Sequence, residues 1–281
     1  MKTGIVGLGL MGGSWALALR NANPSVETIG FDQLEQHRSQ AEQLGLVSRC
    51  STSMNELLDE VDQIVLSIPV DAIETLLPEI LDQLSVDQAV IDFGSTKSAI
   101  AKAVVDHPNR SRYVAAHPIA GTEYSGPDAA FSTLYKGKVM IVCDGEQSDN
   151  APLEIFLRQC IQLGMEVVHQ TSEEHDLHLA YVSHLSHVTS FSLSNTVLNK
   201  EKEEQQILAL AGSGFASTVR LAKSSPEMWS PIFLKNKDAM LQAVEDYLLQ
   251  VQRFKSYLKE EDAEAVQRFL EEGREIRKIL K

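Results

Sequence analysis

Apolar residues in the first half of the chain form short runs that alternate with segments of helical spacing. The runs predict strands near residues 2–6, 27–31, 63–68, 89–93, 112–116 and 138–143, and the segments between them predict helices near 12–22, 35–44, 71–84 and 96–106. A helix near 151–163 and a strand near 165–169 close this region. Strands that alternate with helices of this length indicate an α/β domain with a doubly wound, mostly parallel sheet.

The strand patterns stop near residue 170, and the rest of the chain is predicted to be helical. Residues 173–199 contain neither Gly nor Pro and have the apolar spacing of one long helix. Ser225-Pro226 is typical of a helix start, and Ser230-Pro231 repeats that signal, so we expect a kink or a new start there. Residues 232–281 look helical, with a break around 260–262. The sequence thus predicts two domains, 1–170 and an all-α domain, 171–281.

A glycine motif lies between the first predicted strand and the first predicted helix. Gly7-Leu8-Gly9-Leu10-Met11-Gly12 follows the apolar run Thr3-Gly4-Ile5-Val6. In this context the first glycine allows a tight turn, the second leaves room for a pyrophosphate, and the third lets the helix pack close to the strand. Free N–H groups at the helix start would bind the phosphates. The motif indicates a Rossmann-type dinucleotide-binding domain.

An acidic residue at the end of the second predicted strand supports this interpretation. Asp32 lies about twenty residues beyond the glycine turn, where a carboxylate binds the ribose hydroxyls. An ionised carboxylate repels a 2′-phosphate, and the adjacent Gln33-Leu34 offers no cation. The sequence therefore favours NAD over NADP as cofactor.

Small polar residues and prolines follow three other predicted strands, at Ser67-Ile68-Pro69, Ser95 and His117-Pro118. Ligands of doubly wound sheets bind beyond the carboxyl ends of the strands, so these segments are expected to line one crevice, with Ser67, Ile68 and Pro69 beside the cofactor. His117 is the candidate base, because an imidazole near neutral pKa can take the proton of an alcohol undergoing hydride transfer. Ser95 is expected to bond the substrate hydroxyl or orient the imidazole, or alternatively to cap a helix beginning at Thr96.

Polar candidates also occur in the predicted helical domain. His175, His178, His184 and His187 lie close together in sequence, but without HExxH spacing they favour a polar substrate contact over a metal site. Arg220 follows a glycine-bearing turn and suits bidentate binding of a carboxylate, with a surface ion pair as the alternative. Trp229 suits either a core position or a ligand wall.

Net charge, cysteine count and the length of apolar runs exclude several classes of function. The 281 residues carry a net charge of −14, which argues against binding nucleic acid. Three widely spaced cysteines are typical of a reducing cytoplasm rather than of a disulfide framework, and no apolar run approaches membrane-spanning length. The long amphipathic helices favour a homodimer through the second domain, with the alternative that they only cover the first.

These segments together resemble the prephenate/arogenate dehydrogenase family of tyrosine biosynthesis. The resemblance covers nearly the whole chain. It is carried by the glycine motif, Asp92 to Lys97, His117 to Gly126 (HPIAGTEYSG), Ser183 to His187 (SHLSH), Gly214 to Arg220, and Lys223 to Trp229 (KSSPEMW).

The resemblance implies an oxidative decarboxylation of prephenate to 4-hydroxyphenylpyruvate, with hydride transfer to NAD⁺. His117 would take the proton of the C4 hydroxyl, Ser95 would support both groups, and Arg220 would hold a substrate carboxylate. His187 and Trp229 would line the substrate pocket, and Thr122 and Gly214, in the same motifs, are also expected to contact the substrate. The helical domain would form the dimer. With no regulatory domain expected, inhibition by tyrosine would act at the active site.

Several alternatives stay open. Arogenate or both substrates would suit the same residues, because the two compounds differ only in a keto or amino group. A 3-hydroxyacid dehydrogenase has a similar domain order but usually relies on a catalytic lysine, and an NAD-binding sensor would lack turnover. Family members often have Pro where this chain has Ser186, so the orientation of His187 is an open point.

Overall fold

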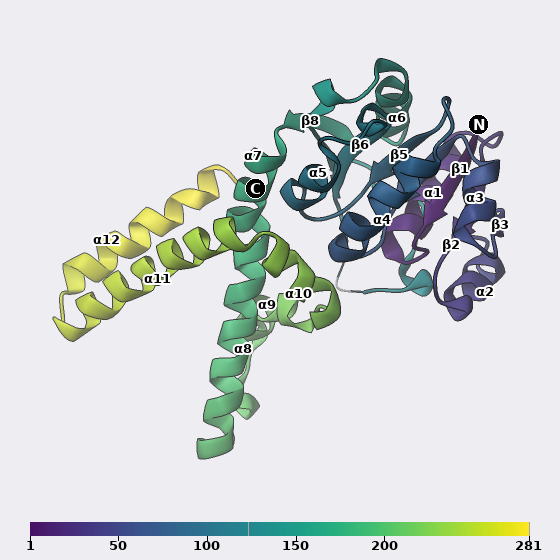
Figure 1. The fold of residues 1–281 in the computed structure, drawn as a ribbon. Coiled ribbons are helices and arrows are strands. Elements are labelled where there is room, and N and C mark those ends of the chain that lie inside the picture. The colour runs from purple at the N-terminus through teal and green to yellow at the C-terminus, as the bar shows by residue number, and fades with distance from the viewer. Residues whose placement is uncertain (123, 281) are drawn as a thin grey trace. The chain divides into compact units, whose positions relative to one another are not determined.

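The computed structural model describes residues 1–122 and 124–280 (Figure 1). It divides into two compact units, residues 1–236 and residues 237–281. The predicted division at residues 170 and 171 falls between a strand and a helix inside the first unit and stays a prediction.

The first unit is built on an eight-stranded sheet in the order β3-β2-β1-β4-β5-β6-β7-β8. All neighbouring strands are parallel except β6 and β7, which confirms the predicted mostly parallel sheet. The two-residue edge strand β3 was not predicted, because it is too short to show a pattern. The strands are β1 Lys2–Val6, β2 Glu27–Phe31, β3 Arg49–Cys50, β4 Gln63–Leu66, β5 Ala89–Asp92, β6 Tyr113–Ile119, β7 Val139–Cys143 and β8 Glu166–Gln170.

Helices cover both faces of this sheet. Successive residues of one strand enter two different apolar clusters, as Ile5 and Val6 do, because side chains alternate across a strand. One cluster surrounds the fully buried Trp15, whose ring meets Phe93 and Tyr135 edge-on. The helices are α1 Leu10–Ala22, α2 Glu35–Gln43, α3 Met54–Glu60, α4 Val70–Gln83, α5 Ser98–Val104 and α6 Asn150–Gln162.

Further helices of the first unit follow the sheet. A capping box of Thr171 and Glu174 starts α7 (Ser172–Leu179), which continues through a π-turn (Ala180–His184) into α8 (Leu185–Glu204), so the predicted long helix is confirmed. Short α9 (Ser213–Thr218) and a 3₁₀ turn (Arg220–Lys223) lead to α10 (Pro226–Lys235).

The start of α10 is as predicted, but the second start is not found. The Ser225 hydroxyl accepts a hydrogen bond from the Met228 N–H and caps the helix. Pro231 lies inside α10, so the expected restart there is wrong. Proline removes one helix hydrogen bond, and the buried Trp229 and Ile232 on either side hold the helix together by packing.

The second unit is a helical hairpin of α11 (Lys237–Lys259) and α12 (Ala263–Arg274). The predicted break at 260–262 is present, with Glu261 at φ 54° and Asp262 capping α12. The rings of Phe254 and Phe269 lie 5.4 Å apart and hold the hairpin together. Across the described ranges no helix has the length and apolar character needed to cross a membrane.

Candidate active site

A cavity of about 480 Å³ opens beyond the carboxyl ends of the parallel strands. The residues around it come from the glycine turn, the ends of β4 to β6, helix α8 and the segment that precedes and includes α10. Among the predicted site residues, its lining includes Gly9, Leu10, Met11, Ser67, Ile68, Pro69, Ser95, His117, Thr122, His187, Arg220 and Trp229. Folding thus brings most of the predicted cofactor and substrate residues to one crevice, while Gly7, Gly12 and Asp32 lie outside its lining.

The glycine turn has the geometry of a phosphate cradle. Gly7 has φ +92°, and a Cβ on it would approach Ile68 to 2.8 Å. A Cβ on Gly12 would overlap the Gly7 carbonyl oxygen and come within 2.9 Å of the Ile5 side chain. At Gly9, by contrast, the nearest atom would be 3.9 Å away. The turn therefore packs tightly at its two ends and leaves space over Gly9, at the start of α1, which fits a dinucleotide pyrophosphate.

Leu8 and Asp32 join the turn to β2. The Leu8 side chain is fully buried in the apolar core, and its N–H donates to Asp32 Oδ2 at 3.0 Å. Of the predicted cofactor contacts, Leu8 thus lies on the core side of the turn and outside the cavity lining.

Two residues of α2 lie near Asp32 that its sequence neighbours do not reveal. Gln33 and Leu34 are uncharged, but the first turn of α2 brings His37 Nδ1 to 3.4 Å from the Asp32 carboxylate. Arg38 donates to the Asp32 carbonyl oxygen at 2.6 Å. A discrimination against a 2′-phosphate at this position therefore rests on the Asp32 carboxylate itself.

His117 lies near the end of β6 and is partly buried. Its Nδ1 is 2.8 Å from Nε2 of His175, whose Nδ1 is in turn 2.8 Å from Asp176 Oδ1. Burial lowers the pKa of His117 well below its usual value, and the neighbouring His175, Lys97 and His184 act in the same direction. The ring is therefore neutral at pH 7, as a proton acceptor must be.

Ser95 faces the same cavity but does not cap the following helix. Helix α5 begins at Ser98, and the cap expected at Ser95 is supplied from α7. The Asp176 carboxylate accepts hydrogen bonds from the N–H groups of Lys97 and Ser98, both at 2.8 Å. The capping alternative for Ser95 is thus wrong, because a carboxylate distant in sequence takes both N–H groups.

A buried polar cluster holds the loop that carries Ser95. The fully buried Lys97 forms an ion pair with Asp92, whose other oxygen accepts a hydrogen bond from the Tyr113 hydroxyl at 2.5 Å. Asp92 also accepts a hydrogen bond from the Gly94 N–H at 2.7 Å. Burial and the adjacent Asp92 raise the pKa of Tyr113 well above its usual value, so its hydroxyl stays a donor. The sequence pattern did not predict this cluster, because its members meet only through packing.

Aromatic and imidazole rings form another part of the cavity lining. His187 stacks on Trp229 with ring centroids 3.5 Å apart and planes at 26°. His187 Nδ1 lies 3.2 Å from the Ser183 carbonyl oxygen, one helical turn earlier. The exposed Ser186 leaves α8 unbroken, so the orientation of His187 is set by Ser183 and Trp229.

The remaining predicted residues fall in different places. Arg220 lies at the start of the 3₁₀ turn and faces the cavity, while Gly214 lies in α9 outside its lining. His178 is exposed beside Gln170. Glu123 of the HPIAGTE motif lies outside the described residues. No group of three metal-ligating side chains is found among residues 1–122 and 124–280.

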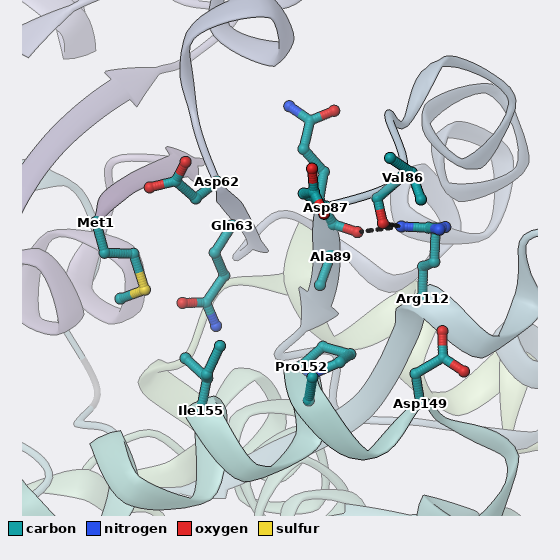
Figure 2. A pocket seen from close by; sticks show the side chains of 12 residues that line it. Met1, Asp62, Gln63, Val86, Asp87, Ala89, Arg112, Asp149, Pro152 and Ile155 are labelled. Carbon is teal, nitrogen blue, oxygen red and sulfur yellow. Dashed lines mark hydrogen bonds between the residues drawn. The ribbon is translucent and has the colours of Figure 1, made fainter.

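A second cavity, of about 590 Å³, lies at the amino ends of the strands (Figure 2). Met1, Asp62, Gln63 and Pro152 line it together with Arg112. The Arg112 guanidinium donates to backbone carbonyls of the turn at residues 85–88. The Arg112 guanidinium thus holds that turn. The catalytic candidates lie at the other end of the strands, their carboxyl ends.

A glycine turn with space for a phosphate, a neutral histidine and an arginine lie around one cavity, an arrangement that suits a nucleotide-dependent dehydrogenase. Family models agree: residues 15–169 match the prephenate dehydrogenase nucleotide-binding domain, and residues 171–272 match the prephenate dehydrogenase dimerization domain. The chain belongs to the prephenate dehydrogenase family.

Individual relatives span most of the chain. It is 29% identical to the prephenate dehydrogenase of Bacillus subtilis, over 97% of this chain and 74% of that protein. It is 28% identical to the cyclohexadienyl dehydrogenase of Zymomonas mobilis, over 99% and 95%. The crystal structure of Aquifex aeolicus prephenate dehydrogenase with hydroxyphenyl propionate and NAD⁺ superimposes with a TM-score of 0.91 at 31% identity, covering 100% of this chain and 98% of that one.

Proposed function

We propose that this protein oxidises prephenate to 4-hydroxyphenylpyruvate and CO₂ with NAD⁺ as hydride acceptor. The observation that carries the proposal is the position of His117, a neutral imidazole that faces the same cavity as the glycine turn and Arg220. Family membership and the NAD⁺ and hydroxyphenyl propionate bound in the Aquifex aeolicus structure support it.

The residues around the cavity have separate tasks in this reaction. When bound, NAD⁺ accepts the hydride from C4 of the ring. His117 takes the proton of the C4 hydroxyl, Ser95 donates a hydrogen bond to that oxygen, and Arg220 pairs with a substrate carboxylate. The ring ketone formed in this way loses CO₂ and becomes a phenolate, to which His117 returns its proton. The proton that His117 takes is thus returned to the product, and the reaction takes no net proton from the protein.

The other predicted contacts surround the substrate. His187 and Trp229 form a flat wall of stacked rings on which the substrate ring can lie. Thr122 lines the cavity, which supports its expected contact with the substrate. Gly214 lies in α9 outside the cavity lining, so its predicted contact with the substrate stays a prediction.

Replacing His117 tests this function. The His117→Asn variant is expected to bind NAD⁺ and prephenate as the wild type does but to lose kcat by about 10²–10⁴-fold, the range typical of general acid–base catalysis. The exposed His178→Asn is the matched control, with unchanged turnover. A His117→Asn variant with normal kcat would remove His117 from the reaction.

Arogenate is the second candidate substrate, because a cyclohexadienyl dehydrogenase is among the relatives. Steady-state rates with prephenate and arogenate, each with NAD⁺ and NADP⁺, separate the two. We expect prephenate and NAD⁺ to give the highest kcat/KM. A higher kcat/KM for arogenate would reassign the substrate.

The assembly and location follow the family. We propose a homodimer through the helical region, supported by the match of residues 171–272 to a dimerization domain. Light scattering coupled to size-exclusion chromatography should give twice the chain mass. We also propose a cytoplasmic location, supported by three free cysteines at Cys50, Cys143 and Cys160.

A further inference from the structure

Two buried residues on α7 continue the hydrogen-bond line that begins at His117. His175 is fully buried, and Asp176 is 4% exposed. The two contacts of the line, from His117 to His175 and from His175 to Asp176, are both 2.8 Å long. The proposed reaction uses only the first of these three side chains, so the other two need an explanation.

The direction of each hydrogen bond follows from the charge on Asp176. Burial opposes ionisation, but hydrogen bonds from His175 and from the Ser98 and Lys97 N–H groups lower the pKa of Asp176. An ionised carboxylate can only accept, so Nδ1 of His175 must donate to it. A neutral His175 then has an unprotonated Nε2, which can only accept from Nδ1 of His117. This leaves Nε2 of His117 as an acceptor.

The carboxylate at the end of the line is held firmly. Its two oxygens accept from the first N–H groups at the start of α5, and the Asp176 carbonyl oxygen accepts from Asn236 Nδ2 at 2.7 Å. Asn236 Nδ2 also lies 3.2 Å from His184 Nδ1. The N–H groups at the start of α5 and the His175 ring thus fix the Asp176 carboxylate, and Asn236 fixes its backbone.

Among the charged groups around His117 and His175, Asp176 is the one that can act as counter-ion to an imidazolium. Lys97 is the nearby cation, and its charge is matched by Asp92 in a buried ion pair. Tyr113 donates to Asp92, and burial lowers the pKa of His184 to about 4, so both side chains are neutral. The negative charge on Asp176 is therefore available to a cation that forms on His117.

We propose that His175 and Asp176 are positioning residues that hold His117 in its Nδ1–H tautomer and stabilise the imidazolium formed when Nε2 takes the C4 hydroxyl proton. The proposal rests on the proposed function. In the Ser-His-Asp triad, a carboxylate that fixes the tautomer of the base contributes about 10⁴-fold to kcat. Here a second ring lies between the carboxylate and the base, so we expect the pair to contribute about 10- to 100-fold to kcat.

Two substitutions of His175 separate the hydrogen bond from the packing. Glutamine can place a carbonyl oxygen where Nε2 accepts from His117, whereas asparagine keeps a donor toward Asp176 and does not reach His117. His175→Asn should lower kcat about 10- to 100-fold with unchanged KM for prephenate and NAD⁺. His175→Gln should recover most of that loss. The exposed His178→Asn, on the same helix, is the control.

Nitrogen-15 NMR of the histidine rings gives a readout that packing alone would not change. In the wild type, His117 should be protonated at Nδ1 and unprotonated at Nε2, and His175→Asn should populate the other tautomer. A wild-type His117 protonated at Nε2 would overturn the proposal even if every variant unfolded. Equal kcat losses for the asparagine and glutamine variants, or a loss in KM rather than kcat, would also overturn it. If His117→Asn itself kept full turnover, the proposed function would fail instead.

Discussion

Two glycines of the nucleotide turn, Gly9 and Gly12, should respond differently to an added methyl group: one in cofactor binding, the other in stability. In Gly9→Ala the new Cβ meets no atom nearer than 3.9 Å, and the backbone, at φ −76° and ψ −159°, suits any residue. Alanine caps a helix less well than glycine by up to about 1 kcal/mol. It also lowers the entropy of the unfolded chain, which stabilises by about 0.4–1 kcal/mol. The stability of this variant should stay near that of the wild type.

Gly12→Ala places its methyl group against rigid backbone. The Cβ would overlap the Gly7 carbonyl oxygen and crowd Ile5 at 2.9 Å, so α1 and the turn must separate. Overpacking costs about 1–3 kcal/mol where side chains can adjust, and a backbone clash should reach at least the upper value. For a unit of this size 1 kcal/mol corresponds to about 2–4 °C. We therefore expect the Tm of Gly12→Ala to fall by about 6–12 °C.

Calorimetric titration with NAD⁺ and thermal unfolding without it separate the two effects. Gly9→Ala should keep its Tm and weaken NAD⁺ binding at least tenfold, about 1.4 kcal/mol, because the methyl group occupies the space proposed for the pyrophosphate. Unchanged NAD⁺ affinity in Gly9→Ala would show that the pyrophosphate lies elsewhere. A Gly12→Ala variant as stable as the wild type would refute the steric argument.

Three further predictions concern charges. Arg220→Ala should raise the KM for prephenate about 10- to 100-fold with a smaller change in kcat, because this fold-change corresponds to the free energy of a charged hydrogen bond. An unchanged KM would exclude the carboxylate contact. Asp32→Ser should raise kcat/KM for NADP⁺ relative to NAD⁺, because Arg38 lies beside Asp32, the residue predicted to bind the ribose. A constant ratio in initial-rate assays would contradict this. Burial lowers the pKa of His184 to about 4 in the folded protein, whereas the pKa in the unfolded chain is about 6.5. Between these two values only the unfolded chain binds the proton, so the protein loses stability as the pH falls from about 6.5 toward 4. At pH 5 the loss is about 2 kcal/mol, and His184→Gln should show a smaller fall in Tm between pH 7 and pH 5 than the wild type.

Local patterns were sufficient for most of the architecture. Apolar runs located the strands of the sheet other than β3, since burial on both faces requires consecutive apolar residues. The glycine turn was recognisable because a strand, a tight turn and a helix leave their requirements in adjacent residues. Ser225 was identified as a cap for the same reason. The order of the motifs was enough to indicate the family, which the family models confirm.

The partners of the candidate catalytic residues were not predictable in this way. The sequence placed His175 in a group of four histidines but did not distinguish it from the exposed His178, three residues further on the same helix. Asp176 was not identified as the cap of α5, and Arg38 was not identified as a neighbour of Asp32. Each of these contacts depends on how one element packs against another.

The sequence by itself therefore determined the class of fold, the nucleotide turn and the candidate base. The nucleotide turn and the candidate base are encoded over a few consecutive residues, and the class of fold by the repeated alternation of strand and helix patterns. The tertiary structure decided which groups surround that base: His175 and Asp176 from α7, Lys97 before α5, and Asn236 after α10. Hydrogen bonds of 2.7–2.8 Å tolerate errors of only a few tenths of an ångström, and such precision comes from packing a helix against a sheet rather than from spacing along the chain.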